Sequence, residues 1–105
     1  MTSYCTFAPS GRIDASNAAI LEKDLLSLME GSGPSVVIDL SGLNYISSAG
    51  LRVLLVGAKS ARARGGKAVI CGAPATIADV LKMSGFDKII PLLPDAATAQ
   101  AQLGA

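Results

Sequence analysis

The sequence predicts a mixed α/β (α+β) domain in which short strands alternate with amphipathic helices. Half of the 105 residues are hydrophobic, and short apolar or β-branched runs recur along the chain. Between these runs, apolar residues recur at spacings of three and four, as on one face of a helix. The length suits one compact core, so we expect residues 1–105 to form a single domain.

The first third of the chain predicts two short strands and a helix. Residues 2–8 carry aromatic and threonine side chains suited to a strand, and a Pro-Ser-Gly turn breaks it. Residues 12–14 then extend as a second edge strand. Ser16 or Asn17 can accept hydrogen bonds from the free N–H groups of a following helix, which stops at Gly31.

The middle third predicts a central strand, a connection and a second helix. Residues 35–40 are apolar without polar alternation until Asp39, as in a strand buried on both faces. Residues 41–46 form a connection that ends in the pair Ser47-Ser48. Beyond them, one face of the helix carries Leu51, Leu54, Leu55 and Ala58, and the pair Gly65-Gly66 closes it.

The last third predicts a strand, a helix, a strand region and a final helix. Residues 67–71 form a short apolar strand, and Pro74 opens a helix that ends before Gly85. Residues 86–93 follow as a short strand region. Asp95 caps the last helix, whose short, alanine-rich sequence needs docking for stability.

Composition excludes several classes of function. Nine Lys and Arg residues against eight Asp and Glu give a net charge of +1. This charge is too small to create a broad positive potential that would attract nucleic acid or anionic membranes. No apolar run reaches the ~18 residues of a membrane span, so we expect no membrane insertion and a soluble, cytoplasmic protein. Cys5 and Cys71 lack the paired spacing of metal or redox motifs and predict buried, reduced thiols.

The residues of enzyme sites are also missing. The chain has no histidine, and its glycines form neither GxGxxG nor the phosphate-binding loop that ends in Gly-Lys-Ser/Thr. Asp39 stands at a strand end without an acidic cluster beside it. We therefore expect no catalytic residue, no metal site and no cofactor, which leaves a small enzyme without an acid, base or electrophile.

The segment 39–52 is the most informative, because it places Ser47 and Ser48 after a buried strand and at the start of a helix. Free N–H groups and the helix dipole stabilise an anion there, so a phosphate on Ser48 is tolerated. From spacing alone, a serine that only caps the helix is the simpler interpretation. The pair Ala49-Gly50 either packs the helix start tightly or lets another protein approach.

This segment resembles the signature of STAS domains: a strand, Asp-Leu-Ser-Gly-like residues, an apolar pair, Asp/Ser-Ser-x-Gly-Leu and a Leu-rich helix. Residues 11–18, 64–67 and 81–89 extend the similarity over nearly the whole chain. The resemblance implies a small mixed β-sheet of four to five strands with about four helices packed mainly on one face. It further implies an anti-sigma factor antagonist, which binds an anti-sigma factor that is also a serine kinase and frees its target.

The resemblance also assigns roles to residues. Matching on Gly50-Leu51 makes Ser48 the serine that the kinase phosphorylates, and a serine phosphatase restores the binding form. Ser47 stands where many antagonists have Asp, and it is a second candidate acceptor. Asp14 and Ser16 resemble residues of the neighbouring partner-binding loop. The predicted partner-binding face is therefore Asp14, Ser16, Ser47, Ser48, Ala49, Gly50 and Arg52.

One alternative of a different class remains. STAS domains also occur as subunits of membrane transport complexes of the ABC type, where the same helix face contacts an ATPase without a phosphorylation cycle.

Overall fold

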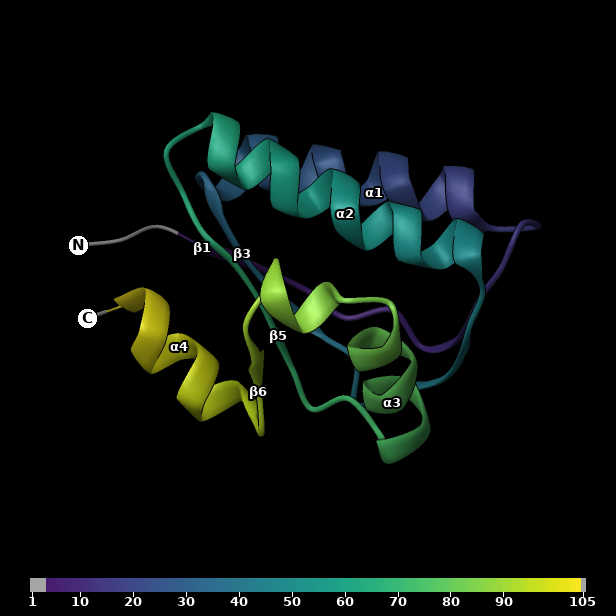
Figure 1. Cartoon of the computed structure of the whole chain (residues 1–105). Coiled ribbons are helices and arrows are strands. Elements are labelled where there is room, and N and C mark those ends of the chain that lie inside the picture. Colours follow the sequence, from purple (N-terminus) through teal and green to yellow (C-terminus); the bar gives the residue numbers. More distant parts are fainter. Residues whose placement is uncertain (1–3, 105) are drawn as a thin grey trace.

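The computed structural model describes residues 4–104, and Figure 1 shows how its elements are arranged. These residues form four α-helices, six strands and one short 3-10 helix. In chain order the elements are β1 (Tyr4–Phe7), β2 (Gly11–Ile13), α1 (Ala18–Ser32), β3 (Ser35–Asp39), β4 (Leu43–Ile46), α2 (Ser48–Ala63), β5 (Ala68–Cys71), α3 (Ala75–Met83), η1 (Phe86–Lys88), β6 (Leu92–Leu93) and α4 (Ala96–Gly104). The predicted α/β class is confirmed.

The strands divide between two sheets. The larger sheet has the order β1-β3-β5-β6, and the smaller sheet pairs β2 with β4. Every pairing between the described strands is parallel, so each neighbour is reached by a crossover that contains other elements. In place of one mixed sheet, the fold thus has a four-stranded parallel sheet and a separate two-stranded one.

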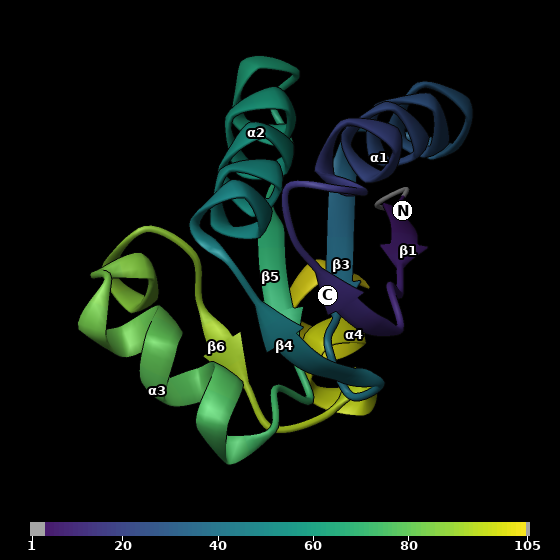
Figure 2. The ribbon, with the colours of Figure 1, turned by 90° about the vertical axis from the view of Figure 1, so that its right-hand side faces the viewer.

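The helices cover the two faces of the larger sheet unequally. Helices α1 and α2 lie side by side on one face, and α4 lies on the other (Figures 1 and 2). The larger core cluster includes Leu25 of α1, Leu54 of α2 and Leu81 of α3. The smaller cluster, under α4, includes Val37 and Leu103. The expectation of helices mainly on one face is confirmed.

The predicted central strand is also confirmed, because Val36, Val37 and Ile38 of β3 are at most 1% exposed and face both clusters. Cys5 and Cys71 are free and buried, and burial raises the pKa of both thiols. Within residues 4–104, no helix is long and apolar enough to cross a membrane.

Two predicted boundaries are wrong. The expected connection 41–46 contains strand β4, because Leu43 and Ile46 turn into the core while the two residues between them stay exposed. The expected strand region 86–93 begins with the 3-10 helix η1, and only Leu92–Leu93 pair with β5. For the first strand, Tyr4–Phe7 are confirmed, and residues 2 and 3 lie outside the described residues.

Candidate functional site

Strands β2 and β4 bring together the two segments that the sequence singled out. Ile13 pairs with Ile46, and the N–H of Ser47 donates to the carbonyl of Ile13 at 2.9 Å. The residues that follow both strands therefore emerge side by side. One segment leads from Asp14 into α1, and the other leads from Ser47 into α2, as Figure 2 shows for the elements.

Asp14 is held firmly at the start of the first segment. Its Oδ1 accepts hydrogen bonds from the N–H of Ser16, at 2.9 Å, and from the Ser16 hydroxyl. Its Oδ2 lies 2.8 Å from Nε of Arg12. The Ser16 hydroxyl is the main cause that lowers the pKa of Asp14, followed by the Ser16 N–H, with a smaller contribution from the Arg12 charge. Asp14 is thus a fixed carboxylate at neutral pH.

The predicted capping of α1 by Ser16 or Asn17 is wrong. Asn17 occupies the N-cap position, but its side chain makes no bond to the helix. Its Oδ1 instead accepts from the N–H of Asp14 and its Nδ2 donates to the carbonyl of Arg12, both at 2.9 Å. The polar side chains therefore stabilise the loop before α1. The N–H of Ala18, the first residue of the helix, donates to the carbonyl of Asp14.

The two serines at the start of α2 have different surroundings. Ser47 is the N-cap and half-buried, and its Oγ accepts from the N–H of Gly50 at 3.3 Å. Ser48 is the first helical residue and is exposed. Among the described residues, no hydrogen-bond partner engages its hydroxyl. The capping interpretation is confirmed for Ser47, while the accessible hydroxyl belongs to Ser48.

Gly50 is buried beneath this face and does not lie on it. A Cβ at this position would lie 2.7 Å from Cγ1 of Ile46, closer than real side chains approach, and 3.0 Å from Cβ of Ile13, which is a tight contact. Gly50 therefore lets α2 pack directly on β2 and β4, which confirms the tight-packing interpretation of this position. Ala49 beside it is half-buried.

An open groove of about 420 Å³ runs beside the two segments, between the first turns of α1 and α2. Its lining is mostly small or aliphatic, with one acid and one base, and consists of Ala15, Ala18, Ala19, Glu22, Ala49, Arg52 and Val53. The structure thus brings together Asp14, Ser16, Ser48 and Ala49 near the groove, and it places the predicted Arg52 on the groove wall.

Sequence reasoning missed two residues of this face. Arg12 pairs with Tyr45 across β2 and β4, and its guanidinium carbon lies 5.8 Å from the centre of the Tyr45 ring. Tyr45 remains 50% exposed, so the pair adds an aromatic surface beside Asp14. The missing signal was strand β4, because only its register places these two side chains together.

The family model described as the STAS domain matches residues 2–99. The chain belongs to the STAS domain family. BtrV of Bordetella bronchiseptica, whose name assigns it to the anti-sigma factor antagonists, is 38% identical over 91 residues, which cover 87% of this chain and 78% of BtrV. The crystal structure of an anti-sigma factor antagonist from Mycobacterium paratuberculosis has a TM-score of 0.85 at 27% identity, covering 95% of this chain and 85% of that one.

More distant solved structures share the fold alone. The unphosphorylated anti-sigma factor antagonist SpoIIAA has a TM-score of 0.80 at 13% identity, covering 100% of this chain and 93% of its own. The STAS domain of a SulP transporter from Vibrio cholerae has a TM-score of 0.71 at 21% identity, with coverages of 91% and 77%. The predicted STAS resemblance is confirmed.

Proposed function

We propose that this chain is an anti-sigma factor antagonist controlled by phosphorylation of Ser48. In its unphosphorylated form it binds a serine-kinase anti-sigma factor and releases a sigma factor or another target. Phosphate on Ser48 switches this binding off, and a serine phosphatase restores it. The names of its similar relatives support the class of function. The observation that carries the switch is the exposed, unengaged hydroxyl of Ser48 at the start of α2.

The contrast with Ser47 supports Ser48 as the acceptor. A kinase needs a hydroxyl that can leave its protein surroundings, whereas the Ser47 Oγ is half-buried and engaged with the Gly50 N–H. A phosphate on Ser48 stays at the positive end of the helix dipole, so α2 remains folded. Modification then changes the charge of the face without changing the fold.

The neighbouring residues supply the partner-binding face. Ser16 and Arg52 are exposed, Asp14 is a fixed carboxylate, and Ala49 lines the groove between the helices. A phosphate on Ser48 adds a charge of about −1.5 to −2 to a face that already carries the Asp14 carboxylate. A partner that is complementary to the unmodified face is then repelled.

The chain acts by binding and carries out no chemistry of its own, and we place this action in the cytoplasm, where transcription is controlled. It has no histidine, and the carboxylate on the proposed face is held by Ser16 and Arg12. A fixed carboxylate of lowered pKa is a poor general base at neutral pH, since it binds a proton weakly.

Three variants test the switch by capture of partners from the cells that make this chain. Ser48→Asp adds negative charge and should weaken binding of the kinase by tenfold or more, while Ser48→Ala keeps binding and resists modification. Ser47→Asp is the matched control, because Asp is also a good N-cap and adds the same charge one residue away. We expect Ser47→Asp to bind nearly as well as the unmodified chain.

Equal binding by Ser48→Ala and Ser48→Asp would contradict the switch. Capture of transporter subunits in place of a kinase would assign the chain to the transport class.

A further inference from the structure

Strand β5 is only half covered at the outer side of the larger sheet. The short strand β6 pairs only with Ile70 and Cys71. The N–H of Ile70 donates to the carbonyl of Pro91 at 2.9 Å. Since backbone groups alternate along a strand, the N–H and C=O of Ala68 point to the same side as those of Ile70. Among the described residues, no backbone group bonds to Ala68 on that side.

The sequence explains why this stretch of the edge is open. If the parallel pairing of β5 and β6 continued toward Ala68, the residue at position 91 would donate its N–H to the carbonyl of Ala68. Pro91 has no N–H and cannot form this bond. Upstream of Pro91, Ile89 belongs to the turn that ends η1. The chain therefore enters the sheet too late to pair with Ala68.

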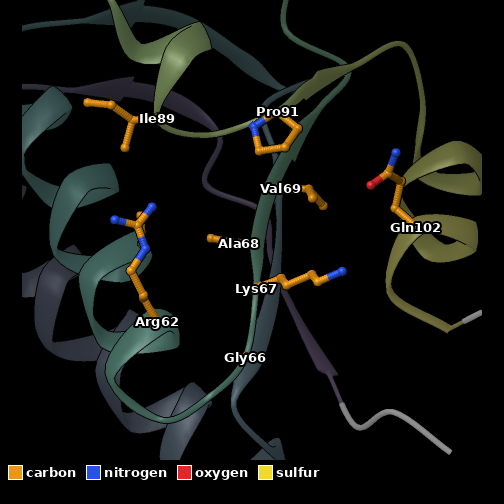
Figure 3. Close-up of a pocket in the computed structure, with 9 residues that line it drawn as sticks. Arg62, Gly66, Lys67, Ala68, Val69, Ile89, Pro91 and Gln102 are labelled. Carbon is orange, nitrogen blue, oxygen red and sulfur yellow. The ribbon is translucent and has the colours of Figure 1, made fainter.

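A small cavity lies at this opening, with a volume of about 180 Å³. We call it the β5 edge notch; the residues that define it are Arg62, Lys67, Ala68, Ile89, Pro91 and Gln102. Figure 3 shows Arg62 on the α2 side of β5, while Lys67 extends on the other side, toward Gln102 of α4. The edge is thus flanked by one cation on each face.

Both cations are available to a ligand. Within residues 4–104, the ion pairs are Arg12 with Asp14 and Arg64 with Glu30, and neither Arg62 nor Lys67 takes part in one. The lining of the notch contains no acidic residue. Its charge is therefore positive on both sides of an unpaired strand edge.

We propose that the β5 edge notch binds an extended peptide segment that carries two adjacent acidic residues. An extended peptide offers both an N–H for the Ala68 carbonyl and a carbonyl for the Ala68 N–H, in the manner of strand addition. Adjacent residues of a strand point to opposite faces, so neighbouring carboxylates reach Arg62 and Lys67 at the same time.

Two other occupants fit the notch less well. Inorganic phosphate can bind a cation, but it has no strand backbone that would pair with both the N–H and the C=O of Ala68. A second copy of this chain lacks the required pattern, because none of its Asp and Glu residues are adjacent. The notch also lies apart from Ser48, since Arg62 is fourteen residues further along α2, or ~20 Å at 1.5 Å per residue. The two sites can therefore be occupied independently.

Nuclear magnetic resonance of the full chain tests the proposal with two peptides of equal composition. Acetyl-Thr-Val-Glu-Glu-Val-Thr-amide has adjacent acids, and acetyl-Thr-Glu-Val-Glu-Val-Thr-amide places both acids on one face. We expect the first peptide to shift the Ala68 amide, slow its hydrogen exchange and bind at least fivefold more tightly than the second. The Ile70 amide should keep its exchange rate, because it already bonds to Pro91.

Variants separate the backbone from the charges. The double variant Arg62→Gln, Lys67→Gln should bind the adjacent-acid peptide at least fivefold more weakly. The control Arg64→Gln removes a cation that is already paired with Glu30 and should leave this affinity unchanged. Ala68→Pro removes the edge N–H at a strand's first residue, where proline is tolerated, and should weaken the binding of both peptides.

Equal binding of the two peptides, or shifts confined to other residues, would overturn the proposal. If inorganic phosphate alone produced the same shift and slowed exchange of the Ala68 amide, the notch would be a simple anion site and not a peptide site.

Discussion

A glycine lies in close contact with the rest of the fold near each end of helix α2. Near its start, Gly50 presses against Ile13 and Ile46, and just beyond its end, Gly66 lies so close to Pro34 that a Cβ would fall 2.4 Å from the Pro34 carbonyl oxygen. The first contact involves side chains, whereas the second involves backbone. Both ends are thus fixed by close approach, but the start has more room to adjust.

The two ends differ in what they leave open to solvent. At the start, the Ser47 side chain caps the Gly50 N–H, and the hydroxyl of Ser48 is exposed to solvent. At the end, the chain continues into β5, where the open groups are the backbone of Ala68 and the cations Arg62 and Lys67. A switch by modification suits the first surface, and strand addition suits the second.

The largest expected effect is the loss of stability when a methyl group is added at the closely packed glycines. Gly66→Ala should lower the free energy of unfolding by about 3 kcal/mol, because the Pro34 backbone cannot move aside. Gly50→Ala should cost about 1 to 2 kcal/mol, since the atoms nearest the new Cβ belong to the side chains of Ile46 and Ile13 and not to backbone. Urea denaturation followed by circular dichroism measures both.

Gly31→Ala is the matched control for these variants. A Cβ at Gly31, inside α1, meets nothing within 4 Å, and its backbone has no positive φ. The variant should leave the stability unchanged or raise it by up to about 1 kcal/mol. Equal losses at all three glycines would mean that close packing does not distinguish the ends of α2.

The next effect separates the two serines. Ser47→Ala removes the bond from the Gly50 N–H and should destabilise the chain by about 1 kcal/mol. Ser48→Ala removes an exposed hydroxyl and should change stability by less than about 0.5 kcal/mol. The same urea titration compares them, and a larger loss for Ser48→Ala would reverse the assigned roles.

The smallest effect concerns the charge beside Ser48. Because the folded-state pKa of Asp14 is lowered, its contribution to stability is present above the unfolded pKa of about 3.9 and is lost as the pH falls through the folded value. Ser16→Ala should raise the pKa of Asp14 more than Arg12→Gln does, since the Ser16 hydroxyl is the main cause. Carboxyl chemical shifts recorded against pH measure this, and the opposite order would contradict it.

Most of the fold could be predicted from the sequence, because periodicity and breaks mark its longest elements. The buried run of β3 and the apolar stripe of α2 are local patterns. Strand β4 was missed because its burial skips two residues between Leu43 and Ile46, which does not alternate as a half-buried strand should. The two exposed residues in its middle form a strand because β4 pairs with β2, and this contact joins residues that are far apart in the sequence.

The site was predicted in its residues but not in their roles. The sequence places Ser47 and Ser48 side by side but does not tell which of them is the N-cap of α2. That depends on which residue first adopts helical geometry. Likewise, Asn17 occupies the expected cap position, yet its amide bonds back to the Arg12 segment. Gly50 showed no signal that distinguishes a buried contact from an exposed one. Such roles follow from tertiary contacts alone.

The most direct test of the central claim is to locate the phosphate on the chain. Intact-mass analysis of the protein purified from its own cells, followed by fragment mapping, distinguishes the two adjacent serines. We predict phosphate on Ser48, together with a copurifying serine kinase. Phosphate confined to Ser47, or an unmodified chain that copurifies with transporter subunits, would contradict the proposed switch.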